Sequence, residues 1–446
     1  MHHNAIRLII TIHLILFAYM WNTAWAQQEE KVDDIKGKTL TLETCIRIAV
    51  ERHPDIRSKI AEVNAGKSRV GQSFSSFLPS LDFSSGYSKS GSEGERDQYR
   101  SSFAGSDSGE NYTFGFVLSQ NIFDFGRSFS QWRMSKEEAN AISFVLNTTG
   151  QNIAFNVEEA YYNRLRVLRL EKVTHEALAR AELHLKQARG FYEVGSRPKI
   201  DLIRAEVDVS NAKVELIKAK NDVRLSSVNL DNAMGLSEPV SYQIKDEPEF
   251  IKPDYHLDEL LALAYRNRPE LLELEARSKG LEQKVRLCKS ERFPKLSGRL
   301  SYDWEGDSTP LAQEWRAGIT LDVPLFSGFD TSYKLRQARE DLKGLNARVE
   351  SLKLQIKKEV EDGLLALKEA EERILAARAA VEQARENLRL ADGRYEVGLG
   401  SIIDLTDARV LFLETNTNWI QALYDYKLNG AAIRKAAGTT PFEIED

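Results

Sequence analysis

The segment Tyr395–Arg409, YEVGLGSIIDLTDAR, has a near copy at Tyr192–Glu206, YEVGSRPKIDLIRAE. Both copies begin with Tyr-Glu-Val-Gly and reach Ile-Asp-Leu a few residues later. A glycine at this place is typical of a helix C-terminus, because glycine adopts the left-handed conformation there at little cost. The two copies therefore predict the same helix–turn–helix unit at two places, 203 residues apart.

The similarity extends far beyond the turns. An offset of 203 holds without a gap from Gly115, which pairs with Gly318, to the end of the second copy. Before a 12-residue length difference the offset is 215, which pairs Pro54 with Pro269. Such self-similarity predicts a tandem duplication.

The duplication predicts the following organisation. We expect a signal peptide at 1–26, a first repeat at 27–235 with a β-hairpin at about 78–124, a Pro-rich linker at 236–255, a second repeat at 256–438 with a β-hairpin at about 294–325, and a tail at 439–446.

The first 26 residues read as an export signal. A short polar start leads into the apolar run LIITIHLILFAYM and then into Ala24–Ala26, a small-x-small cleavage site. An uncleaved anchor helix is the alternative, but the apolar run is shorter than a span of about 20 residues. The mature chain then keeps Cys45 and Cys288, which we expect to be isolated buried residues rather than a disulfide.

Composition excludes several functions. The net charge is -6 with 29% charged residues, which argues against a nucleic-acid partner. The histidines are scattered, and no metal-binding spacing, phosphate-binding loop or nucleophile motif occurs, so we expect neither an enzyme nor a cofactor. His175 and His184 fall on a long predicted helix, where we expect them to face solvent.

Each hairpin alternates between aromatic and polar residues. In the first, Phe114 and Phe116 alternate with Thr113 and Gly115, and the second hairpin repeats the pattern. Strands of about 10 residues with this alternation suit either a soluble sandwich or a transmembrane barrel. The rest of the chain offers no partner sheet, so we favour the barrel. Four strands are too few to close one, because the smallest such barrels have about eight, and we expect several chains to share it.

A long helix follows each hairpin, at about Ser128–Gly190 and Thr331–Gly393. In the second, small and apolar residues recur at alternating steps of mostly three and four, which is typical of helices packed along a seam. About 60 residues make a helix of roughly 90 Å. No globule of 446 residues can bury two such helices, so the sequence predicts an extended bundle or tube.

These features together resemble the TolC-like outer-membrane efflux proteins. The similarity covers the duplicated order of elements, the FLPSL and RFPKL hairpin entries, the QNIFDFGR and VPLFSGFD exits, and the YEVG turns. The resemblance implies a homotrimer in the outer membrane of a Gram-negative bacterium. Its fold would be mainly α with transmembrane β: a 12-stranded β-barrel, four strands from each chain, above a periplasmic α-helical barrel.

The resemblance also implies roles for the turns. Asp404 and Asp407 match an aspartate pair that constricts the periplasmic entrance and could bind cations, although Ser401 and Asp404 also fit a helix-capping pattern. Tyr395 matches a gate tyrosine that hydrogen-bonds towards the equivalent of Asp201. Familiar members carry an arginine where this chain has Gly400, so we expect a differently built lock. The adaptor-docking turns would be Val194, Gly195, Ser196, Val397, Gly398 and Leu399.

The function implied is export. The channel would carry small molecules or proteins outward together with a periplasmic adaptor and an inner-membrane pump of the RND, ABC or MFS type, in contact with outer-membrane lipid. Type I protein secretion and metal-ion efflux are alternatives. A secreted coiled-coil adhesin is the rival from another class, but it would not explain two aromatic hairpins.

Overall fold

The computed structural model describes residues 35–90, 109–238, 240–246, 255–307 and 310–440. The expected signal peptide, the loop of the first hairpin at 91–108 and residues 441–446 of the expected tail lie outside these ranges.

Within these ranges the two repeats contain the same helices and strands in the same order, and the first repeat has a 3-10 turn in addition. The first repeat has α2 (Leu42–Arg52), α3 (Pro54–Phe74), a 3-10 turn (Ser75–Phe77), β2 (Ser80–Ser90), β3 (Gly109–Phe123), α4 (Arg127–Glu193) and α5 (Lys199–Ala233). The second has α6 (Leu257–Asn267), α7 (Pro269–Ser290), β5 (Lys295–Gly306), β6 (Ala312–Asp322), α8 (Asp330–Glu396) and α9 (Ile402–Ala436). Two short strands, β1 (Thr39–Leu40) and β4 (Gln243–Ile244), lie outside this pattern.

The helix starts follow from local chemistry. The hydroxyl of Thr41 accepts a hydrogen bond from the backbone N–H of Thr44 and so caps α2. Pro54 and Pro269 occupy the first position of α3 and α7, where the missing N–H costs nothing. The two prolines thus set the boundary between α2 and α3 and the boundary between α6 and α7.

The long helices α4 and α8 have 67 residues each, about 100 Å at 1.5 Å per residue. Both run three residues further than expected, because Gly190 and Gly393 lie inside the helix. The glycines that end them are Gly195 and Gly398, which have left-handed backbone angles. Across the described parts of the chain, no helix has both the length and the apolar character to cross a membrane.

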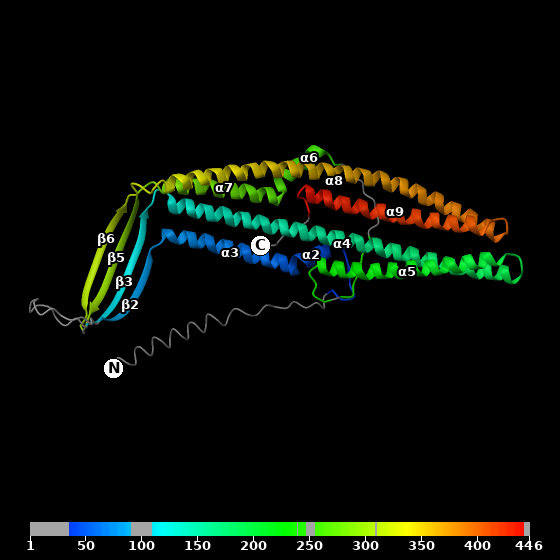
Figure 1. Cartoon of the computed structure of the whole chain (residues 1–446), viewed down its shortest axis with the longest axis horizontal. Helices are drawn as coiled ribbons and strands as arrows, with labels where there is room; N and C mark the ends of the chain where they lie inside the picture. The colour runs from blue at the N-terminus through cyan, green and yellow to red at the C-terminus, as the bar shows by residue number, and fades with distance from the viewer. Residues whose placement is uncertain (1–34, 91–108, 239, 247–254, 308–309, 441–446) are drawn as a thin grey trace, which may run out of the picture.

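The helices form one elongated row (Figure 1). α4 packs against α3 and α5 on one side and against α7 and α9 on the other, and α8 packs against α7 and α9. α3 and α5 follow each other along one line, as do α7 and α9 along another. At the first junction a Cβ on Gly235 would lie 2.9 Å from the Cα of His53, which starts α3. Glycine is required there, because the end of α5 lies directly against the start of α3.

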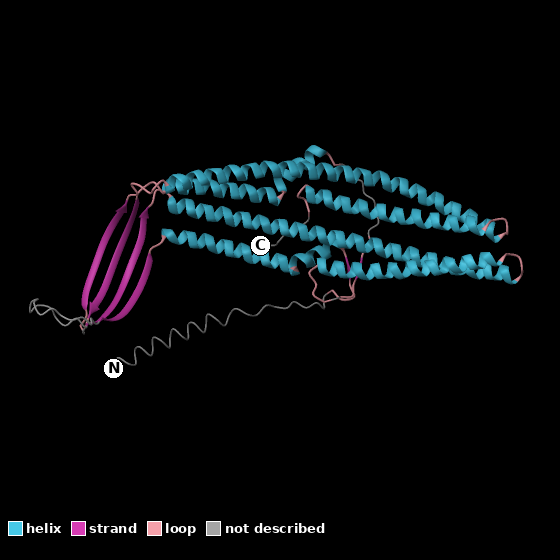
Figure 2. Ribbon diagram, viewed as in Figure 1, coloured by secondary structure: helices cyan, strands magenta, loops and turns pink. Residues whose placement is uncertain are grey.

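A four-stranded antiparallel sheet continues one end of the row in the order β2-β3-β5-β6 (Figure 2). Its register brings aromatic side chains side by side, with Phe83 opposite Phe116, Phe116 opposite Tyr302, and Tyr302 opposite Trp315. Phe83 and Trp315 are nevertheless exposed. In the described ranges β2 and β6 each pair on one side only. The sheet therefore has an uncovered apolar face and two open edges.

The described part of the segment between the repeats contacts the first repeat. β4 pairs in parallel with β1. The Tyr161 hydroxyl donates a 2.6 Å hydrogen bond to the carbonyl of Lys245, and Arg169 lies 2.7 Å from Asp246. Cys45 and Cys288 are both buried and free, as expected.

Candidate functional site at the helical tip

The end of the row opposite the sheet consists of two similar turns. The backbone N–H of Gly195 bonds to the carbonyl of Tyr192 at 3.0 Å, and that of Gly398 to Tyr395 at 3.1 Å. Their φ angles are +70° and +81°, which only glycine adopts without strain. The side chains beside these glycines are uncovered, and the exposed fractions of Val194, Val397 and Leu399 are 77%, 70% and 76%. Among the expected docking residues, these three thus form an apolar tip.

Gly400 is glycine for a steric reason. Its N–H donates a 2.8 Å hydrogen bond to the carbonyl of Arg394, so the turn folds back on the end of α8. A Cβ here would lie 3.0 Å from the backbone nitrogen of Tyr395 and 3.1 Å from the carbonyl carbon of Arg394. An arginine could enter this position only if the backbone shifted.

The aspartate pair lies at the start of α9. Ser401 caps the helix by accepting a 3.1 Å hydrogen bond from the N–H of Ile403. Asp404 falls in the first turn, where the helix dipole favours a negative charge. Asp404 and Asp407 are both exposed and lie one turn apart, whereas the first repeat has the exposed Arg204 in place of Asp407. The carboxylates thus face away from the row.

Tyr395 is buried, although its counterpart in the first repeat is not. The exposed fraction is 1% for Tyr395 and 40% for Tyr192. Burial raises the pKa of the Tyr395 hydroxyl, and the negative charge of the buried Asp201 adds to the rise. The structure therefore brings Tyr395 and Asp201 together, but within the described residues this hydroxyl has no hydrogen-bond partner. Hydrogen bonding between them stays a prediction.

His184 contacts Tyr395, and its expected solvent-facing position is wrong. Only 2% of His184 is exposed, and its ring centroid lies 4.8 Å from that of Tyr395 at an interplanar angle of 36°. Neither ring nitrogen has a hydrogen-bond partner in the part of the chain that is described. The pKa of His184 is lowered to about 4, mainly because the ring is buried and in smaller part because of the positive charge of Arg409. The expectation failed because α4 has neighbours on two sides.

Arg197 joins the two turns, although it was not among the residues predicted from the sequence. Its Nη2 donates a 3.1 Å hydrogen bond to the carbonyl of Gly400, and its Cζ lies 5.1 Å from the centroid of the Tyr395 ring. The repeat offset of 203 pairs Arg197 with Gly400 itself. That pairing was a usable signal: one repeat has the arginine where the other has glycine.

Further polar contacts lie near the buried Tyr395, along α9. Arg409 lies 3.3 Å from Asp392, and the Thr406 hydroxyl donates a 3.3 Å hydrogen bond to Asp208. A cavity of about 220 Å³ between α4, α5 and α9 is lined by Arg409, Thr406 and Asp208 and by apolar residues such as Phe412. The two halves of the chain are thus tied near the tip by side chains rather than by backbone pairing.

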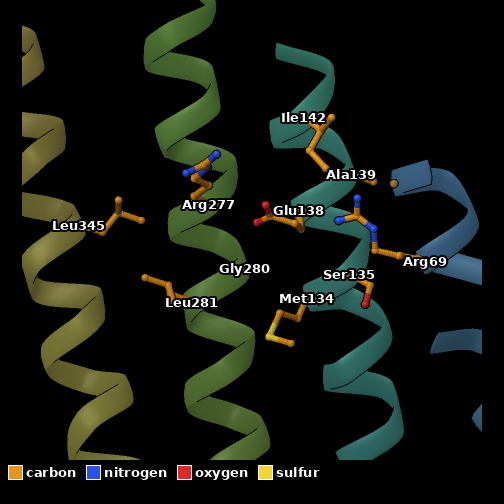
Figure 3. A pocket seen from close by; sticks show the side chains of 11 residues that line it. Arg69, Met134, Ser135, Glu138, Ala139, Ile142, Arg277, Gly280, Leu281 and Leu345 are labelled. Atoms are coloured by element: carbon orange, nitrogen blue, oxygen red, sulfur yellow. The ribbon is translucent and has the colours of Figure 1, made fainter. Parts of the chain in front are cut away.

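A second hollow is lined by residues of α3, α4, α7 and α8 (Figure 3). Of these helices, α3 and α7 lie in the half of the row next to the sheet (Figure 1). The hollow has a volume of about 390 Å³ and lies where Gly66 of α3 and Gly280 of α7 let these helices approach α4. Figure 3 shows Glu138 on α4 between Arg277 on one side and Arg69 on the other. This mixed lining is part of the helix packing and is separate from the predicted site residues.

Comparison with known proteins gives the family. The family model for outer membrane efflux proteins matches residues 45–236 and 260–439. The chain is 24% identical over 412 residues to the outer membrane protein TolC of Salmonella enteritidis, covering 87% of this chain and 79% of TolC. It is 22% identical over 413 residues to the alkaline protease secretion protein AprF of Pseudomonas aeruginosa, covering 88% and 83%.

The fold agrees with this match. The crystal structure of the Campylobacter jejuni CmeC outer membrane channel superposes with a TM-score of 0.79 at 18% identity, covering 94% of this chain and 92% of CmeC. The duplicated row of helices, the aromatic sheet and the family match together show that the chain belongs to the outer membrane efflux protein family and is an outer-membrane channel of the TolC type.

Proposed function

We propose that three copies of this chain form one conduit. The single observation that carries the proposal is that α5 and α8, at opposite sides of the row, are apolar on two opposite faces. One face of each packs within the chain, and the other is exposed. The exposed stripe comprises Ile200, Ile203, Val207, Val214, Ile217, Leu225 and Val228 on α5, and Leu354, Leu365, Leu375 and Leu390 on α8.

An exposed apolar stripe of this length is typical of an interface. Its residues recur at helical intervals, so each stripe offers a seam for another helix. The open edges of β2 and β6 present unpaired backbone groups, which favour pairing with another strand. In the proposed trimer the α5 side of one chain meets the α8 side of the next, and β2 meets β6. Both contacts close the row into a ring.

The ring gives a continuous water-filled path. Twelve strands, four from each chain, are enough to close a transmembrane barrel with apolar side chains outward and polar side chains inward. The helices continue the tube into the periplasm for about 100 Å. The tip with Asp404 and Asp407 is then the periplasmic entrance.

At the entrance the two aspartates of three chains converge. Six carboxylates around a narrow axis attract cations and repel anions. Arg204 occupies the place of Asp407 in the first repeat, so we propose that only α9, and not α5, lines the constriction. Cation binding at this ring is electrostatic and calls for no dedicated metal site.

The entrance is tested by replacing the pair. Asp404→Ala with Asp407→Ala should lower the cation preference of single channels in planar bilayers and abolish block by multivalent cations. The matched control is Glu193→Ala with Glu396→Ala, which removes two exposed carboxylates per chain at the ends of α4 and α8. Unchanged selectivity and block in the Asp404/Asp407 variant, with a normal trimer, would exclude the proposed constriction.

Export requires partners that supply energy. We propose that a periplasmic adaptor docks on the turns around Gly195 and Gly398, where Val194, Val397 and Leu399 are uncovered. An inner-membrane pump would then deliver cargo to the entrance. Small compounds are the favoured cargo. Protein secretion is the second candidate, because the match to AprF, a protease secretion protein, covers 83% of its length.

A further inference from the structure

We propose that Arg197 is the latch that holds the tip of this chain closed, and that the latch works between the two halves of a single chain. The inference rests on the proposed function of the tip as an entrance. The guanidinium of Arg197, in the turn of the first repeat, binds the carbonyl of Gly400 in the turn of the second, at 3.1 Å. The same group lies over the ring of Tyr395, 5.1 Å from its centroid.

The two contacts fix two different parts of the second turn. The hydrogen bond holds the backbone just before α9, and the cation–π contact holds the end of α8. A planar guanidinium can do both at once, because its N–H groups point out of its edge while its face stacks on a ring. Releasing Arg197 would free the whole second turn from the first.

The lack of space around residue 400 explains why the arginine is in the first turn, at position 197, and not in the second turn. A side chain on residue 400 would collide with the backbone of Arg394 and Tyr395. Arg197, at the matching place in the first repeat, reaches the same turn from outside. The absence of a side chain at Gly400 thus leaves its carbonyl open to Arg197.

The environment of Tyr395 shows that this contact closes a packed pocket. His184 stacks on Tyr395 from α4, and Phe191 lies 6.2 Å from its ring centroid. Arg197 contacts the same ring, so Tyr395 is held by side chains of the first repeat. Tyr192, which has the matching place in the first repeat, is 40% exposed. The tie is therefore asymmetric: the first half of the chain holds the second.

The position of Arg197 also connects docking with opening. It lies directly after Ser196, inside the first of the two turns proposed for the adaptor. A protein that docks there touches the residue that holds Tyr395. Engagement of the first turn and release of the second turn are then one event within each chain.

The test is single-channel recording of the full-length trimer in planar bilayers. Arg197→Ala should raise the ratio of open to closed states about tenfold to a hundredfold per chain, the range expected for losing a hydrogen bond made by a charged group. Arg197→Lys keeps the charge but lacks the planar face, and should give an intermediate ratio. Arg204→Ala removes an exposed arginine from α5, the helix that follows this turn, and should gate as the unmodified channel does.

The amount of heat-sensitive trimer is measured for each variant, so that assembly and gating are separated. If Arg197→Ala forms a normal trimer and has the same ratio of open to closed states as the unmodified channel, the proposed latch is wrong. If Arg197→Ala assembles poorly, Arg197→Lys decides, and unaltered gating in that variant would also overturn it. An unmodified trimer that shows no cation-selective conductance would instead count against the proposed channel entrance.

Discussion

His175 and His184 lie nine residues apart on α4, and no local sequence pattern separates them. His175 is exposed, whereas His184 is buried against Tyr395. The matching residue of the second repeat, Asn387, is exposed as well. Burial at 184 therefore depends on where Tyr395, more than 200 residues away, comes to lie. The turn glycines and the cap at Ser401 were predictable, because each is settled by its own neighbours.

The lowered pKa of His184 predicts how stability changes with pH. The unfolded chain holds this histidine at an ordinary pKa of about 6.5, and the folded chain at about 4. Between these values only the unfolded state takes up the proton, so the stabilisation present above pH 6.5 is lost as the pH falls towards 4. The loss is at most about 3 kcal/mol per chain.

Thermal unfolding of the protein in detergent from pH 7.5 to 4.5 measures this dependence. His184→Phe keeps a ring beside Tyr395 but cannot titrate, so its stability should fall less steeply with acid. His175→Phe is the control and should keep the slope of the unmodified protein. Equal slopes for all three proteins would show that His184 does not titrate as its burial requires.

At the scale of elements, the lengths of the helices and strands followed closely from periodicity. Periodicity did not predict how α5 meets α3 end to end, or how α9 meets α7. Gly235 and Gly438 make these junctions, since a Cβ on Gly235 would lie 2.9 Å from the Cα of His53, and one on Gly438 would lie 3.0 Å from the backbone of Arg268. Both glycines also have positive φ, +71° and +68°. Both repeats thus have the same kind of junction, a glycine with positive φ packed against the start of a helix.

Alanine at the first joint should destabilise the protein strongly. Gly235→Ala adds the cost of a left-handed residue, about 1–2 kcal/mol, to the collision with His53. Gly37→Ala is the matched control, because Gly37 has φ +76° but open space around it. Thermal unfolding in detergent should show a clearly larger loss for Gly235→Ala. Equal losses would mean that the contact with His53 does not matter.

At the scale of the whole molecule, the chain is an open row whose outer helices have an unused apolar face. This explains why a chain with no membrane-spanning helix in its described parts exposes so many large apolar side chains. The tube was expected from helix length alone, since no compact globule of this size could hold such helices. Which helices form the sides of the row required the structure, because both repeats contain similar helices.

A charge on the exposed face of α5 should prevent assembly. Ile217 is 68% exposed in the single chain, and in the proposed trimer Ile217→Asp would bury an unpaired carboxylate, which is costly. Lys220→Asp, on another exposed part of α5, is the control. Unheated gels and chemical cross-linking should show loss of the trimer for Ile217→Asp, with helix content kept in circular dichroism. A normal trimer in that variant would rule out this face as the interface.

The sequence by itself determined the duplication, the type and approximate length of each main element, the two tip turns and the family resemblance. These depend on periodicity and on residues with strong local preferences, such as glycine after a helix and serine before one. Only the tertiary structure decided that Tyr395 is buried while Tyr192 is exposed, that His184 is the neighbour of Tyr395, and that Arg197 bonds to the carbonyl of Gly400. Those outcomes depend on contacts between segments about 200 residues apart, because the packing of the row gives corresponding residues of the two repeats different neighbours.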